Sequence, residues 1–232
     1  MITLVTFDAA GTLIDHRWDP GAIAREAVKD LGITVDLDEA RDRYEHVSAE
    51  FRAEQFALEK IGDRQGIHEL WDRQMAAWLD AVGADPSIAR DALTIFRERV
   101  FGPSSHVWSV YPDVLPAVEA LRDKGIIIGI ISNWDHTLFE VLDNLQMSDL
   151  FDFAIASLEF GYEKPDRRIF IEALAQGGAT AEETVHVGDS LEDDFIGATD
   201  AGMGALLLDR EASADFTAGR ISSLLQVSEV IA

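Results

Sequence analysis

Four short segments of the sequence carry the residue types that hydrolysis of an anionic substrate requires. Between them they supply a carboxylate nucleophile, small polar donors, a cation and metal-binding acids; the segments are FDAAGTL (Phe7 to Leu13), IISN (Ile130 to Asn133), EKPD (Glu163 to Asp166) and VGDSLEDD (Val187 to Asp194). Each follows or lies near an apolar run that is typical of a β-strand. Together, these residues could therefore carry out nucleophilic attack on an anionic substrate.

Asp8 is the candidate nucleophile. A carboxylate held at the end of a strand can attack phosphorus or carbon when it is partly shielded from water. Gly11 permits a tight turn after it, and the Thr12 hydroxyl is expected to hydrogen-bond the carboxylate. Taken alone, an aspartate before a glycine-containing turn is just as consistent with an ordinary turn residue.

The next two segments offer donors and a positive charge. Ser132 and Asn133 end an apolar run and could donate hydrogen bonds to a phosphoryl or carboxyl oxygen, and Lys164 could neutralise both nucleophile and substrate. Alone, Ser132 and Asn133 would be interpreted as a helix N-cap. A lone lysine beside a proline would be interpreted as a solvated loop residue.

The last segment suggests a metal site. Asp189 follows a strand-like run, and Asp194 lies five residues later. Mg²⁺ prefers oxygen ligands and is commonly bound by one or two carboxylates. Acids at a helix N-terminus also favour the helix dipole, and Asp193 is assigned to that ordinary role.

The elements that must position these residues are predicted from hydrophobic periodicity. Buried strands are expected at residues 2–7, 126–131, 153–156, 184–187 and 205–208. Helices are expected at residues 20–31, 38–60, 65–82, 86–102, 112–124, 135–145, 166–176 and 193–201. From residue 107 onward, strands alternate with helices, which predicts a Rossmann-like parallel α/β sheet with helices on both faces.

Residues 15–103, which follow the first strand, contain no convincing strand and are predicted to form an inserted all-helical cap domain. The expected division is residues 1–14 and 104–232 for the sheet core and residues 15–103 for the helical cap. Ligands of open parallel sheets bind beyond the carboxyl ends of the strands. Asp8, Ser132 and Asp189 each follow a predicted strand, so they should converge on one edge.

Composition limits the function classes. The net charge of -24 disfavours nucleic acid and anionic membranes as partners. A small anionic substrate would need a local cation. The chain has no cysteine, which excludes disulfides and thiolate metal sites. No run reaches the length of a membrane span and the N-terminus lacks a basic start, so a cytoplasmic protein is expected. The oligomeric state cannot be predicted.

In this order, the four segments resemble the motifs of the haloacid dehalogenase superfamily of hydrolases, and the helical block resembles the cap of many members. The resemblance implies that Asp8 forms a covalent aspartyl intermediate, that Thr12, Ser132 and Asn133 orient the substrate, and that Lys164 balances charge. It also implies Mg²⁺ as the cofactor; its expected site comprises Asp8, the backbone carbonyl of Ala10, Asp189 and Asp194, the last through water or by orienting its neighbours.

One position departs from the pattern. Phosphatases of this superfamily carry a general acid and base two residues after the nucleophile, where this chain has Ala10. Three explanations remain open: the leaving group needs little protonation, another residue such as Asp15 or His16 supplies the proton, or the reaction is not phosphate-ester hydrolysis.

The function predicted is Mg²⁺-dependent hydrolysis of a small phosphorylated metabolite. One alternative is a 2-haloacid dehalogenase, although the resemblance implies that enzymes of this class work without metal and lack a GD motif. The other is a hydrolase similar to phosphonoacetaldehyde hydrolase, which needs a lysine in the cap. The expected cap contains only Lys29 and Lys60. A further alternative is a non-catalytic protein that binds metal and ligand, using cap aromatics that we otherwise assign to the cap core.

Overall fold

The chain forms two compact units. The computed structural model describes residues 1–102, 104–211 and 219–231. The sheet unit comprises Met1–His16 and Ser109–Ala232, and the helical unit comprises Arg17–Trp108. The sequence placed the divisions at residues 14/15 and 103/104, two and five residues earlier along the chain. Pro103, at the second of these, and Ala232 lie outside the described residues.

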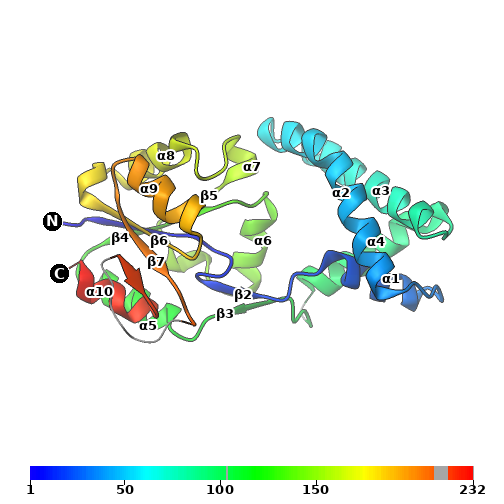
Figure 1. Cartoon of the computed structure of the whole chain (residues 1–232), viewed down its shortest axis with the longest axis horizontal. Helices are drawn as coiled ribbons and strands as arrows, with labels where there is room; N and C mark the ends of the chain where they lie inside the picture. The colour runs from blue at the N-terminus through cyan, green and yellow to red at the C-terminus, as the bar shows by residue number, and fades with distance from the viewer. Residues whose placement is uncertain (103, 212–218, 232) are drawn as a thin grey trace. The chain divides into compact units, whose positions relative to one another are not determined.

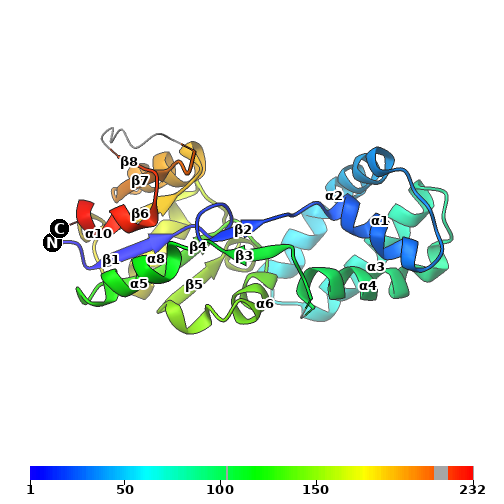
Figure 2. The ribbon, with the colours of Figure 1, turned by 90° about the horizontal axis from the view of Figure 1, so that it is seen from below.

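The sheet unit, drawn in Figures 1 and 2, is built on six parallel strands in the order β5-β4-β1-β6-β7-β8. Their bounds are β1 (Leu4–Phe7), β4 (Ile127–Ser132), β5 (Phe153–Ala156), β6 (Thr184–Gly188), β7 (Gly204–Leu208) and β8 (Arg220–Ile221). All residues of β1 and β6 are buried, as expected for central strands covered on both faces. The parallel Rossmann-like sheet predicted from the sequence is confirmed.

The helices of the sheet unit lie on both faces of the sheet. In Figure 1, α8 and α9 lie on one side and α5 and α10 on the other. The α-helices are α5 (Val114–Arg122), α6 (Thr137–Asn144), α7 (Ser157–Phe160), α8 (Arg167–Gly177), α9 (Gly197–Asp200) and α10 (Val227–Val230); short 3₁₀ turns span Ser148–Leu150, Ala181–Glu183 and Leu224–Gln226. Under α8 and α9, a core that includes Ile131, Ile155 and Phe170 excludes water from the sheet.

The structure departs from the sequence prediction in two details. The helix expected at residues 193–201 is a π-helix, Leu191–Ile196, followed by the short α9. Its wider turn is visible in the bond from the Phe195 amide to the Ser190 carbonyl, at 3.2 Å. Two three-residue strands, β2 (Ile14–His16) and β3 (Trp108–Val110), form a separate small sheet that the sequence did not reveal.

The helical unit contains four long helices, α1 (Pro20–Asp30), α2 (Leu37–Lys60), α3 (Arg64–Ala81) and α4 (Ala89–Phe101), with a 3₁₀ turn at Pro86–Ile88. Aspartate side chains accept hydrogen bonds from backbone N–H groups at the starts of α1, α2, α3 and the 3₁₀ turn; these residues are Asp19, Asp36, Asp63 and Asp85. A core of Trp78, Phe96 and neighbouring aliphatic residues holds the helices together. The all-helical insertion predicted from the sequence is confirmed.

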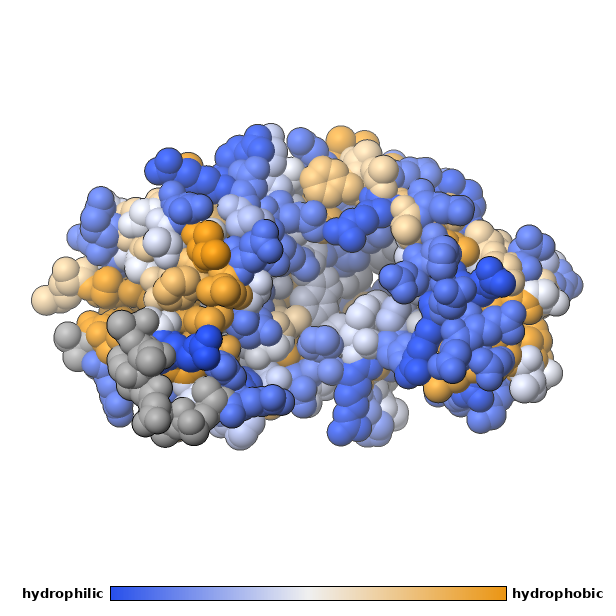
Figure 3. Space-filling model, in the orientation of Figure 1, coloured by the Kyte–Doolittle hydropathy of each residue, from blue (hydrophilic) through white to orange (hydrophobic). Residues whose placement is uncertain are grey.

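The surface is strongly polar. Hydrophilic residues cover most of the face drawn in Figure 3, in keeping with 43 acidic residues against 19 basic ones. Within the described ranges, every helix is too short or too polar to cross a membrane.

Candidate active site

Three strand ends bring the predicted residues together. The central strand β1 pairs with β4 on one side and β6 on the other, so that Phe7 lies opposite both Ile130 and Val187. Asp8 follows β1 directly, and its backbone N–H donates to the Val187 carbonyl at 2.9 Å. The carboxyl ends of the three strands therefore place Asp8, Ser132 and Asp189 at one edge of the sheet.

Lys164 is the charged centre of this edge. Its Nζ donates to Asp8 Oδ1 at 2.7 Å and to Asp194 Oδ1 at 2.6 Å. Ser132 Oγ donates to the same oxygen of Asp8 at 3.4 Å. Lys164 is 4% exposed and Asp8 is 7% exposed. Because a buried ammonium group without a partner is costly, these carboxylates are the reason that Lys164 can lie here.

Asn133 has a different contact from the one expected. Its side-chain Nδ2 donates to the Lys164 carbonyl at 2.9 Å, and its Oδ1 accepts from the Lys164 N–H at 2.7 Å. The amide thus binds both backbone groups of one residue, which fixes the loop that presents the lysine. The expected role of Asn133 in orienting substrate stays a prediction.

Thr12 also has a different partner. Its hydroxyl donates to Asp189 Oδ1 at 3.5 Å, and not to Asp8 as the sequence suggested. Gly11, with φ of +83°, makes the close approach possible, since a Cβ at this position would lie 2.4 Å from Asp189 Oδ2. The turn after Asp8 therefore packs directly against Asp189.

Ala10 lies within that turn. The hydrogen bonds that close the turn use the carbonyls of Ala9 and Ile14: Leu13 N and Ile14 N donate to Ala9, and Gly11 N donates to Ile14. The Ala10 carbonyl takes no part in these bonds. A backbone oxygen at this position is a suitable ligand for Mg²⁺, whatever the side chain.

Asp8, Asp189 and Asp194 form a group that could hold a metal ion, with one oxygen of each within 4.8 Å of the others. Three carboxylates near one ammonium leave an excess of negative charge, and hard oxygen donors suit Mg²⁺. Asp194 is already held by other donors, since Lys164 and His186 contact Oδ1 and the Ser190 N–H donates to Oδ2 at 3.0 Å. Asp8 and Asp189 are therefore the better candidates for direct ligation.

The electrostatics agree with this division. Burial raises the pKa of Asp8 despite the nearby Lys164, and burial together with the charge on Asp194 raises the pKa of Asp189. At Asp194, the Lys164 and His186 contacts outweigh burial and hold the pKa well below its usual range. Lys164 and Asp194 thus form a charged pair, whereas the charge on Asp8 and Asp189 would be balanced by a bound divalent cation.

Two groups of residues near the site were missed by sequence reasoning. On the neighbouring strands β1 and β6, Thr6 and His186 form a buried hydrogen bond of 2.9 Å between their side chains. Beside the Asp8 turn, Arg210 donates to the Thr12 carbonyl at 2.6 Å and pairs with Asp113. The sequence carried no signal for either group, because buried strand residues and a lone arginine are common in ordinary structure.

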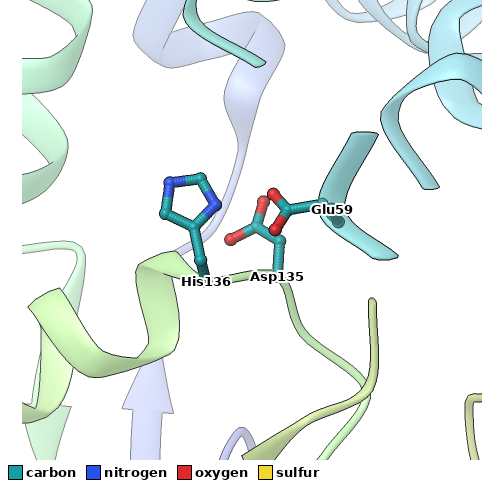
Figure 4. A group of neighbouring side chains, drawn as sticks. All are labelled: Glu59, Asp135 and His136. Atoms are coloured by element: carbon teal, nitrogen blue, oxygen red, sulfur yellow. The ribbon is translucent and has the colours of Figure 1, made fainter. Parts of the chain in front are cut away.

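Other titratable residues near the motifs have local partners. Asp15 is exposed and accepts a hydrogen bond from the Tyr111 hydroxyl at 3.4 Å. Asp135 and His136 lie between β4 and α6, and Asp135 accepts the Thr137 N–H at the start of α6, at 2.9 Å (Figure 4). Glu59, also drawn there, belongs to the last turn of α2 in the helical unit.

Comparison with known proteins agrees with the fold and the motifs. The profile of the haloacid dehalogenase-like hydrolase family matches residues 2–202. A curated relative, glyceraldehyde 3-phosphate phosphatase from Methanopyrus kandleri, is 30% identical over 88% of this chain and 82% of its own length.

Two solved structures illustrate the range of proteins that share this fold. A 2-haloacid dehalogenase from Pseudomonas syringae pv. Tomato DC3000 is 28% identical with a TM-score of 0.73, covering 100% of this chain and 98% of that one. A HAD phosphatase from Thermococcus onnurineus is 25% identical with a TM-score of 0.65, covering 99% and 98%. From its sequence profile and fold, the chain belongs to the haloacid dehalogenase-like hydrolase family and is an enzyme of that family.

Proposed function

We propose that this enzyme is a Mg²⁺-dependent phosphatase of a small phosphorylated metabolite, with Asp8 as the nucleophile. The observation that carries the proposal is the cluster at the sheet edge: a buried carboxylate bound to Lys164, with Asp189 close enough to share a metal ion. The relative from Methanopyrus kandleri, named glyceraldehyde 3-phosphate phosphatase, supports a small phosphorylated metabolite as the substrate but not a particular leaving group.

In this proposal, Asp8 attacks the phosphorus atom and the leaving oxygen departs with the electrons of its bond, which leaves a phosphoryl group on Asp8. Water then attacks phosphorus, releases phosphate and restores the Asp8 carboxylate. Lys164 and Ser132 hold one Asp8 oxygen in place throughout. Held by Asp8, Asp189 and the Ala10 carbonyl, Mg²⁺ would neutralise charge on the phosphoryl group.

The missing acid at position 10 restricts the substrate. An alanine cannot protonate a departing alkoxide, whereas acyl and aryl phosphates leave as stable anions. Asp15, one alternative donor, is exposed and engaged with Tyr111. We therefore favour substrates whose leaving group needs little protonation.

Restoring the acid should broaden the substrate range. Ala10→Asp is expected to raise kcat for alkyl phosphate esters about 10-fold or more, because a positioned acid contributes roughly 10²–10⁴ to such steps. Turnover of p-nitrophenyl phosphate should change little. The measurement is phosphate release from both substrates with Mg²⁺ present.

The matched control is Ala10→Asn, which has nearly the same shape but cannot transfer a proton in this step. It should leave alkyl ester turnover at the level of the unmodified enzyme. If Ala10→Asp is folded, binds Mg²⁺ and still shows no gain, the chain does not lack an acid, and a different donor or reaction must be sought.

A second candidate function is 2-haloacid dehalogenation. It is favoured by Ala10, because halide leaves without a proton, and by the likeness to the dehalogenase from Pseudomonas syringae. Asp189 opposes it, since a second acid beside Asp8 would repel a carboxylate substrate. A hydrolase that uses a cap lysine is less favoured, because both lysines of the helical unit, Lys29 and Lys60, are exposed and not held in a buried pocket.

A substrate screen with and without Mg²⁺ separates these functions. It should include sugar, aryl and acyl phosphates, phosphonoacetaldehyde and 2-haloacids, with phosphate and halide release measured in parallel. We expect Mg²⁺-dependent phosphate release. Halide release without metal would establish the dehalogenase instead, and binding of phosphorylated ligands without any turnover would indicate a non-catalytic protein. We also propose that the helical unit serves as the cap that selects the substrate.

A further inference from the structure

A buried chain of polar side chains lies behind the nucleophile. Thr6 Oγ1 and His186 Nδ1 are 2.9 Å apart, and His186 Nε2 and Asp194 Oδ1 are 3.1 Å apart. Asp194 then accepts from Lys164, which also contacts Asp8. Thr6 and His186 are fully buried, and Asp194 is 1% exposed. This series of contacts begins on β1, at Thr6, and ends directly after β1, at Asp8.

The direction of these hydrogen bonds follows from the chemistry of the groups. An ionised carboxylate only accepts, so His186 Nε2 carries the proton and donates to Asp194. The Thr6 hydroxyl then contacts the other ring nitrogen, and that contact fixes the orientation of the imidazole. Thr6 and His186 are direct partners on the adjacent parallel strands β1 and β6, which keeps this contact rigid.

Asp194 is held in one orientation. One oxygen accepts from Lys164 and His186, and the other accepts the Ser190 N–H. Behind it the backbone is in close contact, since a Cβ on Gly188 would lie 2.2 Å from Asp194 Cγ. The carboxylate therefore has no room to turn while all three donors remain.

We propose that His186 is a positioning residue for the reaction: it fixes the Asp194 carboxylate, which in turn aims the Lys164 ammonium at Asp8, and Thr6 orients the His186 ring. The role in catalysis rests on the function proposed above. Without the His186 donor, Asp194 loses one of its two side-chain partners, and Lys164 can rotate its three donors away from Asp8. The expected consequence is a poorly held nucleophile, with little change in substrate affinity.

Two amide substitutions test this role as a matched pair. In His186→Gln the amide nitrogen reaches about as far as Nε2 and can still donate to Asp194, whereas in His186→Asn it reaches only as far as Nδ1. We expect His186→Asn to lower kcat about 10–100-fold, as loss of an orienting partner commonly does. KM should stay nearly constant, and His186→Gln should recover most of kcat.

Crystal structures of both variants give a readout that needs no turnover. The contact between Lys164 Nζ and Asp8 Oδ1 should remain in His186→Gln and be lost in His186→Asn. If the wild-type enzyme releases no phosphate from any substrate, the proposed function fails, and these structures still test whether His186 positions Lys164.

Thr6 offers an independent pair should the histidine variants fold poorly. Thr6→Val keeps the shape but removes the hydroxyl, and Thr6→Ser keeps the hydroxyl. We expect kcat to fall in Thr6→Val and to be retained in Thr6→Ser. The proposal is overturned if His186→Asn keeps both the Lys164–Asp8 contact and wild-type kcat. It is equally overturned if kcat falls to the same extent in both variants of each pair, in proportion to their loss of thermal stability.

Discussion

Asp8→Asn is expected to lower turnover of an activated phosphate by at least about 10³-fold while leaving the protein folded. An amide has no anionic oxygen with which to attack phosphorus, so the covalent step is lost. The measurement is phosphate release from acetyl phosphate or p-nitrophenyl phosphate in the presence of Mg²⁺. Thermal unfolding of the same sample shows whether the fold is intact.

Two opposing effects set the stability of this variant. Burial raises the pKa of Asp8, so the folded state favours the uncharged form of this side chain more than the unfolded state does. Above the folded-state pKa, the ionised carboxylate therefore costs stability, and a neutral asparagine removes that cost. The same substitution also removes a charge that pairs with the buried Lys164, which costs stability, so we expect the melting temperature at neutral pH to change little, with metal removed from both proteins.

The control is Asp149→Asn, which makes the same change at an exposed aspartate after α6. It should leave both turnover and melting temperature unchanged. An Asp8→Asn protein that is folded and still turns over phosphate at the wild-type rate would show that Asp8 is not the nucleophile.

Removal of divalent metal should have an effect of similar size. We expect a chelator to lower phosphatase turnover by about 10²-fold or more and Mg²⁺ to restore it, because the phosphoryl charge would otherwise face three carboxylates. Asp189→Asn should raise the Mg²⁺ concentration needed for half-maximal turnover. It replaces a charged ligand with a neutral one at the same position.

Asp200→Asn serves as the matched change, since Asp200 is an exposed residue at the end of α9. It should leave the Mg²⁺ requirement as it is. The same titration can be followed by the heat of Mg²⁺ binding, so the result does not depend on turnover. Full phosphatase activity in the presence of chelator would remove the metal from the proposed mechanism.

Much of the fold could be predicted because its signals are local. The strands of the sheet are apolar, β-branched runs such as β1, and α1, α2 and α3 of the helical unit begin at aspartate caps. The small sheet of β2 and β3 has three residues per strand and is partly exposed, so it carries no alternating or buried pattern. The π-helix depends on the Ser190 carbonyl accepting two N–H groups, which composition does not reveal.

In the site, too, the features set by local sequence could be predicted and the contacts between distant segments could not. Parallel strands predicted that Asp8, Ser132 and Asp189 would share one edge, and the structure brings them together. The side-chain partners of Thr12 and Asn133 were not predictable, because each contacts a residue from a distant loop. His186 has the sequence pattern of an ordinary buried strand residue, and only the three-dimensional structure shows its contact with Asp194.

The proposed mechanism requires that Asp8 and Asp189 hold one divalent ion at the edge of the sheet, beside Lys164. Crystals soaked in Mn²⁺ test it directly through the anomalous signal of the metal. We expect one strong peak about 2.0–2.2 Å from oxygens of Asp8, Asp189 and the Ala10 carbonyl. Lys164 should keep its hydrogen bond to Asp8. A well-ordered site with no peak, or a peak that Asp8 and Asp189 do not ligate, would contradict it.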